Sequence, residues 1–137
     1  IMIIFICIFT DIGGYIFGNL FKGPKLTKIS PKKTYSGVIG GYLFSIIFMA
    51  AFLNYANEFS EITNINVKAN ELSFNGFILT IFISTVSQLG DIAVSFFKRK
   101  SKIKDTGKII PGHGGLLDRI DGMLFAFPSS YLLVQLL

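Results

Sequence analysis

The residues best suited to chemistry lie in one stretch, residues 87–122, which carries carboxylates, cations and glycines in close succession. It begins in an apolar segment that holds Asp91, crosses a basic cluster, and ends in a glycine-rich turn followed by Asp118 and Asp121. The basic cluster comprises Lys98, Arg99, Lys100, Lys102 and Lys104, and the turn reads Pro111-Gly112-His113-Gly114-Gly115. Carboxylates suit Mg²⁺, cations neutralise phosphates, and glycine lets the backbone approach a ligand closely. The stretch predicts a site that holds a polyphosphate and its metal ions.

Three carboxylates form the predicted metal site. Asp118 and Asp121 are three residues apart, so on a helix they share one face. With Asp91 they can supply the few carboxylates that Mg²⁺ combines with substrate phosphates. Arg119 lies between them and can bind a phosphate through two parallel hydrogen bonds. His113 is the only histidine, and between glycines it is expected to contact or position a phosphate rather than to bind the metal.

A second basic segment, residues 28–37, has the residue types of a phosphate-binding loop. It combines Lys32 and Lys33 with the hydroxyl groups of Ser30 and Thr34. Ammonium groups, hydroxyls and free backbone N–H groups suit phosphate oxygens, and Ser30 before a proline is also a good cap for a following helix. A basic loop that only sets membrane topology has the same composition, so this segment is informative only together with the first stretch.

Long apolar runs surround these segments and must position them. The chain has 137 residues, of which 51% are hydrophobic and 15% charged, whereas soluble chains carry about 25% charged residues. Four runs approach the ~20 apolar residues of a spanning helix, at residues 1–21, 37–56, 74–97 and 123–137. We predict an all-α, polytopic integral membrane protein with about four transmembrane helices, forming one catalytic domain over residues 1–137.

The basic residues indicate which side of the membrane the loops occupy. Of the 13 lysines and arginines, five lie in the loop at 22–36 and seven in the loop at 98–121, which leaves only Lys68 on the other side. By the positive-inside rule the two basic loops face the cytoplasm, where we expect them to form the active site. This distribution differs from a nucleic-acid-binding face, so we expect no nucleic-acid partner.

Two carboxylates, Asp11 and Asp91, lie inside the apolar runs. A charge there costs at least ~2.5–3.5 kcal/mol on insertion scales, so it normally faces protein, water or an ion. Either residue alone suits a structural anchor between helices equally well. Because both apolar runs lead to the basic side, the presence of both residues favours a functional site over two structural anchors. Asp11 is followed by glycines at 13, 14 and 18, which allow close helix approach or a local break.

These motifs resemble the signature of the phosphatidate cytidylyltransferase (CDP-diacylglycerol synthase) family. Residues 95–121 follow the pattern S-x-x-K-R-x4-K-D-x-G-x3-P-G-H-G-G-x-x-D-R-x-D. Residues 10–18 look like the family's A-D-T-G-A-Y-x-x-G element and residues 28–34 like its S-P-K-K-T element. Ile12 stands where Thr is common, and Tyr35-Ser36 where Trp-Glu is frequent, and neither departure removes a predicted ligand. The resemblance corresponds to the C-terminal half of the family, so we expect this chain to be part of a longer protein.

The resemblance implies an enzyme that converts CTP and phosphatidate into CDP-diacylglycerol and pyrophosphate. It implies Mg²⁺, with a second cation such as K⁺, and a homodimer in the bacterial cytoplasmic (inner) membrane whose active site faces the cytoplasm. CTP, phosphatidic acid and membrane lipids are the implied partners. Asp91, Asp118 and Asp121 would hold the metal. The remaining implied site residues are Lys32, Lys33, Lys98, Arg99 and Arg119 as phosphate-neutralising cations, Asp11, Ser30 and Thr34 in the nucleotide pocket, and Lys104, Asp105, Gly112, His113, Gly114 and Gly115 in substrate binding.

Other interpretations fit some of the same residues. An ion-coupled transporter segment explains Asp11 and Asp91 on glycine-containing helices, but not the loop that joins Gly-His-Gly-Gly to Asp-Arg. A CDP-alcohol phosphotransferase is disfavoured because its D-G-x2-A-R-x8-G-x3-D-x3-D pattern is missing. A cytidylyltransferase for another lipid phosphate, and an inactive chain that assembles with a partner, are both compatible with the motifs.

Overall fold

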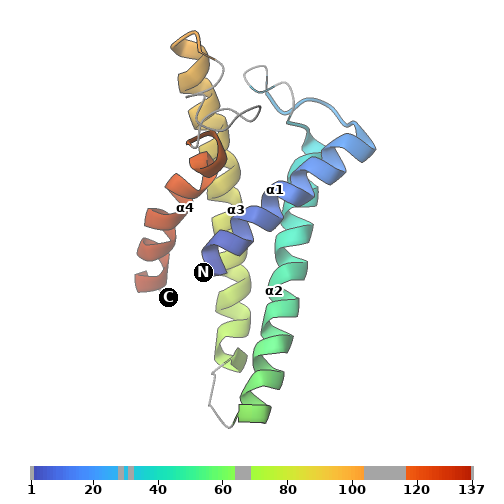
Figure 1. Cartoon of the computed structure of the whole chain (residues 1–137), viewed down its shortest axis with the longest axis vertical. Coiled ribbons are helices and arrows are strands. Elements are labelled where there is room, and N and C mark those ends of the chain that lie inside the picture. Colours follow the sequence, from blue (N-terminus) through green and yellow to red (C-terminus); the bar gives the residue numbers. More distant parts are fainter. Residues whose placement is uncertain (1, 28–29, 31–32, 64–68, 104–116, 137) are drawn as a thin grey trace.

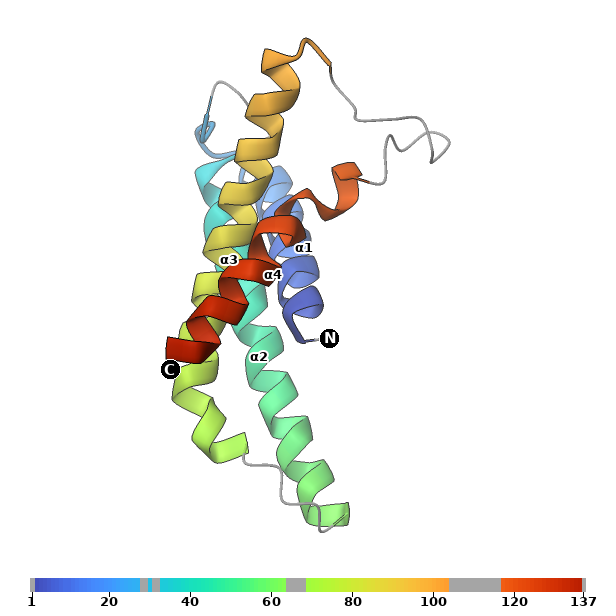
Figure 2. The same ribbon diagram turned by 90° about the vertical axis from the view of Figure 1, so that its left-hand side faces the viewer.

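The computed structural model of the chain contains four α-helices and, within residues 2–27, 30, 33–63, 69–103 and 117–136 that it describes, no β-strand (Figure 1). The helices are α1 (Met2–Phe21), α2 (Tyr35–Thr63), α3 (Ala69–Lys100) and α4 (Leu117–Leu136). α1 runs diagonally across the upper half of α2 and α3, and α4 lies alongside α3 (Figures 1 and 2). The predicted all-α architecture is confirmed.

Three of the four helices are long and apolar enough to cross a membrane, through the segments Met2–Phe21, Tyr35–Tyr55 and Phe74–Lys100. Their outward side chains are large and apolar: Ile47, for example, is 63% exposed. Small hydroxyl side chains are buried between the helices instead, among them Thr10, Ser84 and Ser87. This arrangement is expected in lipid, where close packing and hydrogen bonds hold helices together and apolar groups face the hydrocarbon. The predicted polytopic membrane protein is confirmed, although among the described residues three helices, and not the expected four, reach the length and hydropathy of a span, and α4 is not one of them.

The helices α2 and α3 extend beyond the apolar runs from which they were predicted. α2 continues to Thr63 and α3 begins at Ala69, so most of the predicted connection at 57–73 is helical. At its other end α3 includes Lys98, Arg99 and Lys100, which the sequence predicts as the start of the loop at 98–121. Good helix formers continue a helix into water, and cations in a last turn interact favourably with the helix dipole. The basic cluster thus starts on a helix end.

α1 and α2 approach so closely that their backbones touch. A Cβ atom built on Gly13 would lie 2.3 Å from the Gly40 carbonyl oxygen, and one on Gly40 would lie 2.4 Å from Phe17 Cβ. Small residues permit this kind of backbone approach between membrane helices. The glycines after Asp11 therefore act in helix contact, one of the two predicted roles, and α1 remains unbroken through them. The contact holds α1 across the start of α2, where the basic segment ends.

We predict that Gly13→Ala lowers the free energy of unfolding by about 1–3 kcal/mol, because the new methyl group meets backbone that cannot yield. Gly14→Ala is the matched control, since its Cβ would lie 3.5 Å from the Gly37 carbonyl oxygen, an ordinary contact. Thermal unfolding in detergent micelles, followed by circular dichroism, measures both variants. Equal loss of stability in the two variants would contradict the assignment of the tight contact to Gly13.

Candidate active site

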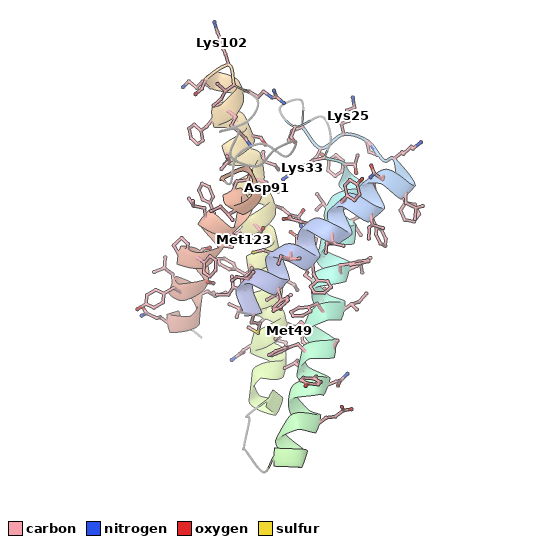
Figure 3. The ribbon with its side chains drawn as sticks, in the orientation of Figure 1. Lys25, Lys33, Met49, Asp91, Lys102 and Met123 are labelled. Atoms are coloured by element: carbon pink, nitrogen blue, oxygen red, sulfur yellow. The ribbon has the colours of Figure 1, made fainter. Side chains whose placement is uncertain are left out.

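A cavity of about 240 Å³ lies between α1, the start of α2 and α3. It brings together four of the predicted site residues: Asp11, Lys33, Thr34 and Asp91. The other lining residues are Thr10, Gly14 and Tyr15 of α1, Gly37 and Val38 of α2, and Gln88 of α3. Residues far apart in the sequence thus meet at the end of the bundle to which the basic segments lead, and Figure 3 shows Lys33 and Asp91 near one another there.

An ion pair between Lys33 and Asp91 crosses this cavity. Lys33 Nζ donates to Asp91 Oδ2 at 2.8 Å and to the Gln88 carbonyl oxygen at 3.3 Å. The two side chains are only 28% and 20% exposed, so water weakens their attraction less than at an open surface. The pair links the segment before α2 to α3, and it places a cation directly beside a predicted metal-binding carboxylate.

Backbone hydrogen bonds hold Lys33 in this position. The Leu26 N–H donates to the Lys33 carbonyl oxygen at 2.8 Å, and the Lys33 N–H donates to the Ser30 carbonyl oxygen at 3.1 Å. Thr34 then caps α2, because its Oγ1 accepts a hydrogen bond from the Gly37 N–H at 3.1 Å. The cap predicted at Ser30 is wrong. Thr34 pairs with Lys25 in an isolated antiparallel bridge, and the helix starts only at Tyr35.

The carboxyl groups of Asp91 and Asp121 meet where α3 contacts α4. Burial, together with a hydrogen bond between these two carboxyl groups and the charge of Asp91, raises the pKa of Asp121 to about 7. Asp121 Oδ1 accepts from the Gly122 N–H at 2.9 Å, and its Oδ2 lies 3.6 Å from Lys98 Nζ. A Cβ at position 122 would lie 2.7 Å from Asp91 Oδ1 and 2.9 Å from the Ser87 carbonyl oxygen, so a side chain there would force α3 and α4 to shift. Two carboxyl groups therefore meet in a partly buried place, each with a lysine beside it.

These groups fit a hard cation such as Mg²⁺. Two carboxylates converge from different helices, and Mg²⁺ in proteins takes one or two carboxylates and completes its shell with waters and phosphates. The buried Ser87 hydroxyl lies beside Asp91 and has no hydrogen-bond partner among the described residues. Within the described residues no group of three His, Cys, Asp or Glu side chains gathers. Asp118, the third predicted ligand, has its backbone in the first turn of α4, and its side chain lies outside the described part.

The other predicted residues are placed less centrally or lie outside the described residues. Lys98 reaches the site through Asp121, whereas Arg99 is exposed on the last turn of α3 and does not line the cavity. Ser30 is half-buried and contributes backbone hydrogen bonds to the turn before α2. Arg119 has a helical backbone in α4, and its side chain is not described. Outside the described residues lie Lys32, Lys104, Asp105, Gly112, His113, Gly114 and Gly115.

Sequence reasoning missed Gln88 and the neutral walls of the cavity. A signal for Gln88 was available: it is a polar residue inside an apolar run, three residues before Asp91 and hence on the same helix face. The contributions of Thr10, Tyr15 and Val38 depend on how α1 crosses α2, and no pattern in the sequence reports that crossing.

Comparison with known proteins adds the family. All 137 residues match the family model described as "Cytidylyltransferase family". The chain is 41% identical over 129 residues to a phosphatidate cytidylyltransferase of Staphylococcus haemolyticus, covering 93% of this chain and 45% of that protein. It is 39% identical over 120 residues to the phosphatidate cytidylyltransferase of Haemophilus influenzae, covering 86% of this chain and 39% of that protein. The chain therefore spans less than half the length of these curated relatives.

Proposed function

The chain belongs to the cytidylyltransferase family, and we propose that it carries the active site of a phosphatidate cytidylyltransferase, which transfers CMP from CTP to phosphatidate. The observation that supports this most is the cavity on which Lys33, Asp11 and Asp91 converge, with Asp121 and Lys98 beyond Asp91. A transporter segment would need the intramembrane carboxylates but not the phosphate-type cations that accompany them.

In the proposed reaction a phosphate oxygen of phosphatidate attacks the α-phosphorus of CTP. A new P–O bond forms, the bond from the α-phosphorus to the oxygen that bridges to the β-phosphorus breaks, and pyrophosphate leaves with that bond's electron pair. The barrier is largely electrostatic, because two anions must meet and a third must depart. Lys33 and Lys98 would neutralise the phosphates, and Asp91 and Asp121 would hold Mg²⁺. When bound, Mg²⁺ polarises phosphoryl oxygens and neutralises developing charge.

The place of the site in the membrane suits a lipid substrate. Tyr15 of α1 lines the cavity and is 74% exposed, so acyl chains can remain in lipid beside it. The labelled lysines Lys25, Lys33 and Lys102 lie at one end of the bundle (Figure 3). We place this end at the cytoplasmic face of a bacterial inner membrane, where CTP is available. A second cation such as K⁺ and a homodimer belong to the proposal on the strength of the family resemblance alone.

Label transfer tests the reaction directly. We expect the purified chain, in phospholipid micelles with phosphatidate and Mg²⁺, to move label from [α-³²P]CTP into the lipid phase and to move none from [γ-³²P]CTP. Chelation of Mg²⁺ should reduce transfer to background, and added Mg²⁺ should restore it. Entry of γ-label into lipid would indicate a kinase and contradict the proposal. Mg²⁺-dependent CTP binding without transfer would mean that the chain holds the nucleotide site and needs further segments for turnover.

A further inference from the structure

Gln88 is a polar side chain of the cavity that the proposed reaction does not use. It lies on α3 three residues before Asp91, so the two side chains project from the same helix face about one turn apart. Its main-chain carbonyl oxygen accepts the hydrogen bond from Lys33 at 3.3 Å. Gln88 therefore adjoins the charged groups that we assign to the phosphates and the metal.

Buried hydroxyl groups hold the side-chain amide of Gln88. Gln88 Nε2 donates to Ser84 Oγ at 3.3 Å, and the hydroxyl groups of Ser84 and Thr10 are hydrogen-bonded to each other at 3.0 Å. Ser84 is fully buried and Thr10 is 1% exposed, so this arrangement is shielded from water. Gly41 leaves room for the amide, because a Cβ there would lie 3.1 Å from Gln88 Nε2. The amide nitrogen thus faces protein, and within the described residues the amide oxygen has no hydrogen-bond partner.

An amide held in this way presents its carbonyl oxygen as an acceptor. Phosphatidate carries phosphate and ester oxygens, which are themselves acceptors and gain little from a further one. Cytosine carries an exocyclic amino group, a donor, at the position where uracil carries an oxygen. The cavity of about 240 Å³ equals the liquid volume of roughly eight waters at ~30 Å³ each, which is room for a pyrimidine ring.

We propose that Gln88 determines the nucleotide specificity of the site: its amide carbonyl accepts a hydrogen bond from the amino group of cytosine, so CTP is taken and UTP is rejected. The inference rests on the proposed function, because it assumes that the nucleotide phosphates lie at Lys33 and Asp91. Discrimination follows from two effects. UTP brings an oxygen against the Gln88 oxygen, and it leaves a partly buried acceptor without a donor.

The test compares three nucleotides on matched glutamine variants. Binding of CTP, UTP and the triphosphate of 4-deaminocytidine, which has hydrogen in place of the amino group, is measured by equilibrium dialysis on the chain in micelles. We expect the parent to bind CTP at least about tenfold more tightly than the other two. Gln88→Met should lose affinity for CTP. It should therefore bind all three nucleotides with affinities that agree within a factor of about two. Gln135→Met, at an exposed position on α4, should keep the parent's preference.

A second variant guards against misfolding of the first. Ser84→Ala removes the hydroxyl that holds the amide but keeps Gln88, and it should reduce the preference for CTP several-fold. Retention of the parent's preference in Gln88→Met would overturn the inference. Equal loss of CTP and UTP affinity would also overturn it, because Gln88 would then contact the ribose or phosphates that both nucleotides share.

The remaining outcomes separate this inference from the proposed function. If Gln88→Met lowers phosphatidate binding and leaves CTP binding unchanged, the cavity holds the lipid head group, and the base-reading role is wrong while the enzyme assignment stands. If the parent binds CTP and UTP equally, the enzyme assignment also stands and the inference falls. If the parent binds no nucleotide with or without Mg²⁺, the proposed function falls and this inference with it.

Discussion

Asp91→Asn should reduce CMP transfer from CTP to phosphatidate by about 10³-fold or more. Asp91 is the residue on which the site converges, since it accepts from Lys33, hydrogen-bonds with Asp121 and faces Gly122. Asparagine keeps the shape of the side chain but loses the charge that we propose binds a divalent cation. Initial rates with α-labelled CTP measure the loss, and electron paramagnetic resonance of free Mn²⁺ measures metal binding, which we expect to fall below detection in the same variant.

Glu58→Gln serves as the control for this substitution. It also removes one carboxylate charge, but from an exposed position near the far end of α2. We expect it to leave both transfer and Mn²⁺ binding within a factor of two of the parent. An Asp91→Asn protein that transfers CMP at the parent's rate would show that the metal is held elsewhere, and the site described above would have to be abandoned.

The second large effect is expected for Lys33→Met, in which two measured quantities should change in opposite directions. CMP transfer should fall by about 10²-fold, because the site loses the cation that we propose neutralises a substrate phosphate. Mn²⁺ affinity should rise several-fold, because the Lys33 ammonium, 2.8 Å from Asp91 Oδ2, no longer competes for that carboxylate. Methionine retains most of the length and the apolar stem of the lysine side chain.

Lys25→Met distinguishes a local contact from the general effect of charge. Lys25 is an exposed lysine of the same loop, residues 22–36, and has the same charge, and Figure 3 shows it turned toward the outside. Its replacement should change transfer and Mn²⁺ affinity by less than about twofold, as expected for a screened surface charge. If both lysine variants behave alike, the contribution of Lys33 is a long-range field and the contact with Asp91 has no special role.

The helices could be predicted from the sequence, but their ends could not. Runs of apolar residues of spanning length identify α1, α2 and α3 because lipid requires both the length and the composition. Hydropathy indicates which residues lie in lipid. It does not indicate where the backbone hydrogen bonds of a helix end. α2 and α3 therefore continue through polar residues such as Glu58 and Lys98, for which helical structure in water is favourable. The cap at Thr34 was missed because a turn closed by the Leu26–Lys33 hydrogen bond delays the start of α2.

The residue types of the site could be predicted, whereas their partners could not. Asp91 and Lys33 were chosen for their charges inside or beside apolar runs, but their pairing joins residues 58 positions apart and depends on how α1 and α2 dock on α3. Gly122 shows the same limit. Nothing near it in the sequence reveals that the absence of a side chain brings Asp91 and Ser87 against α4. The pattern along one helix reveals which polar or charged side chains lie in an apolar run. The packing between helices determines which residues these side chains contact.

The ion pair between Lys33 and Asp91 also bears on how the protein is made. Lys33 belongs to the first helical hairpin, α1 and α2, and Asp91 to α3, which is synthesised later. Until α3 arrives, Lys33 has only Asp11 of its own hairpin as a carboxylate in this cavity, and α3 itself must enter lipid with a carboxylate that costs at least ~2.5–3.5 kcal/mol on insertion scales. Closure of the pair relieves both charges at once. The ion pair thus stabilises the packing of α3 against the first hairpin during biogenesis, before any substrate binds.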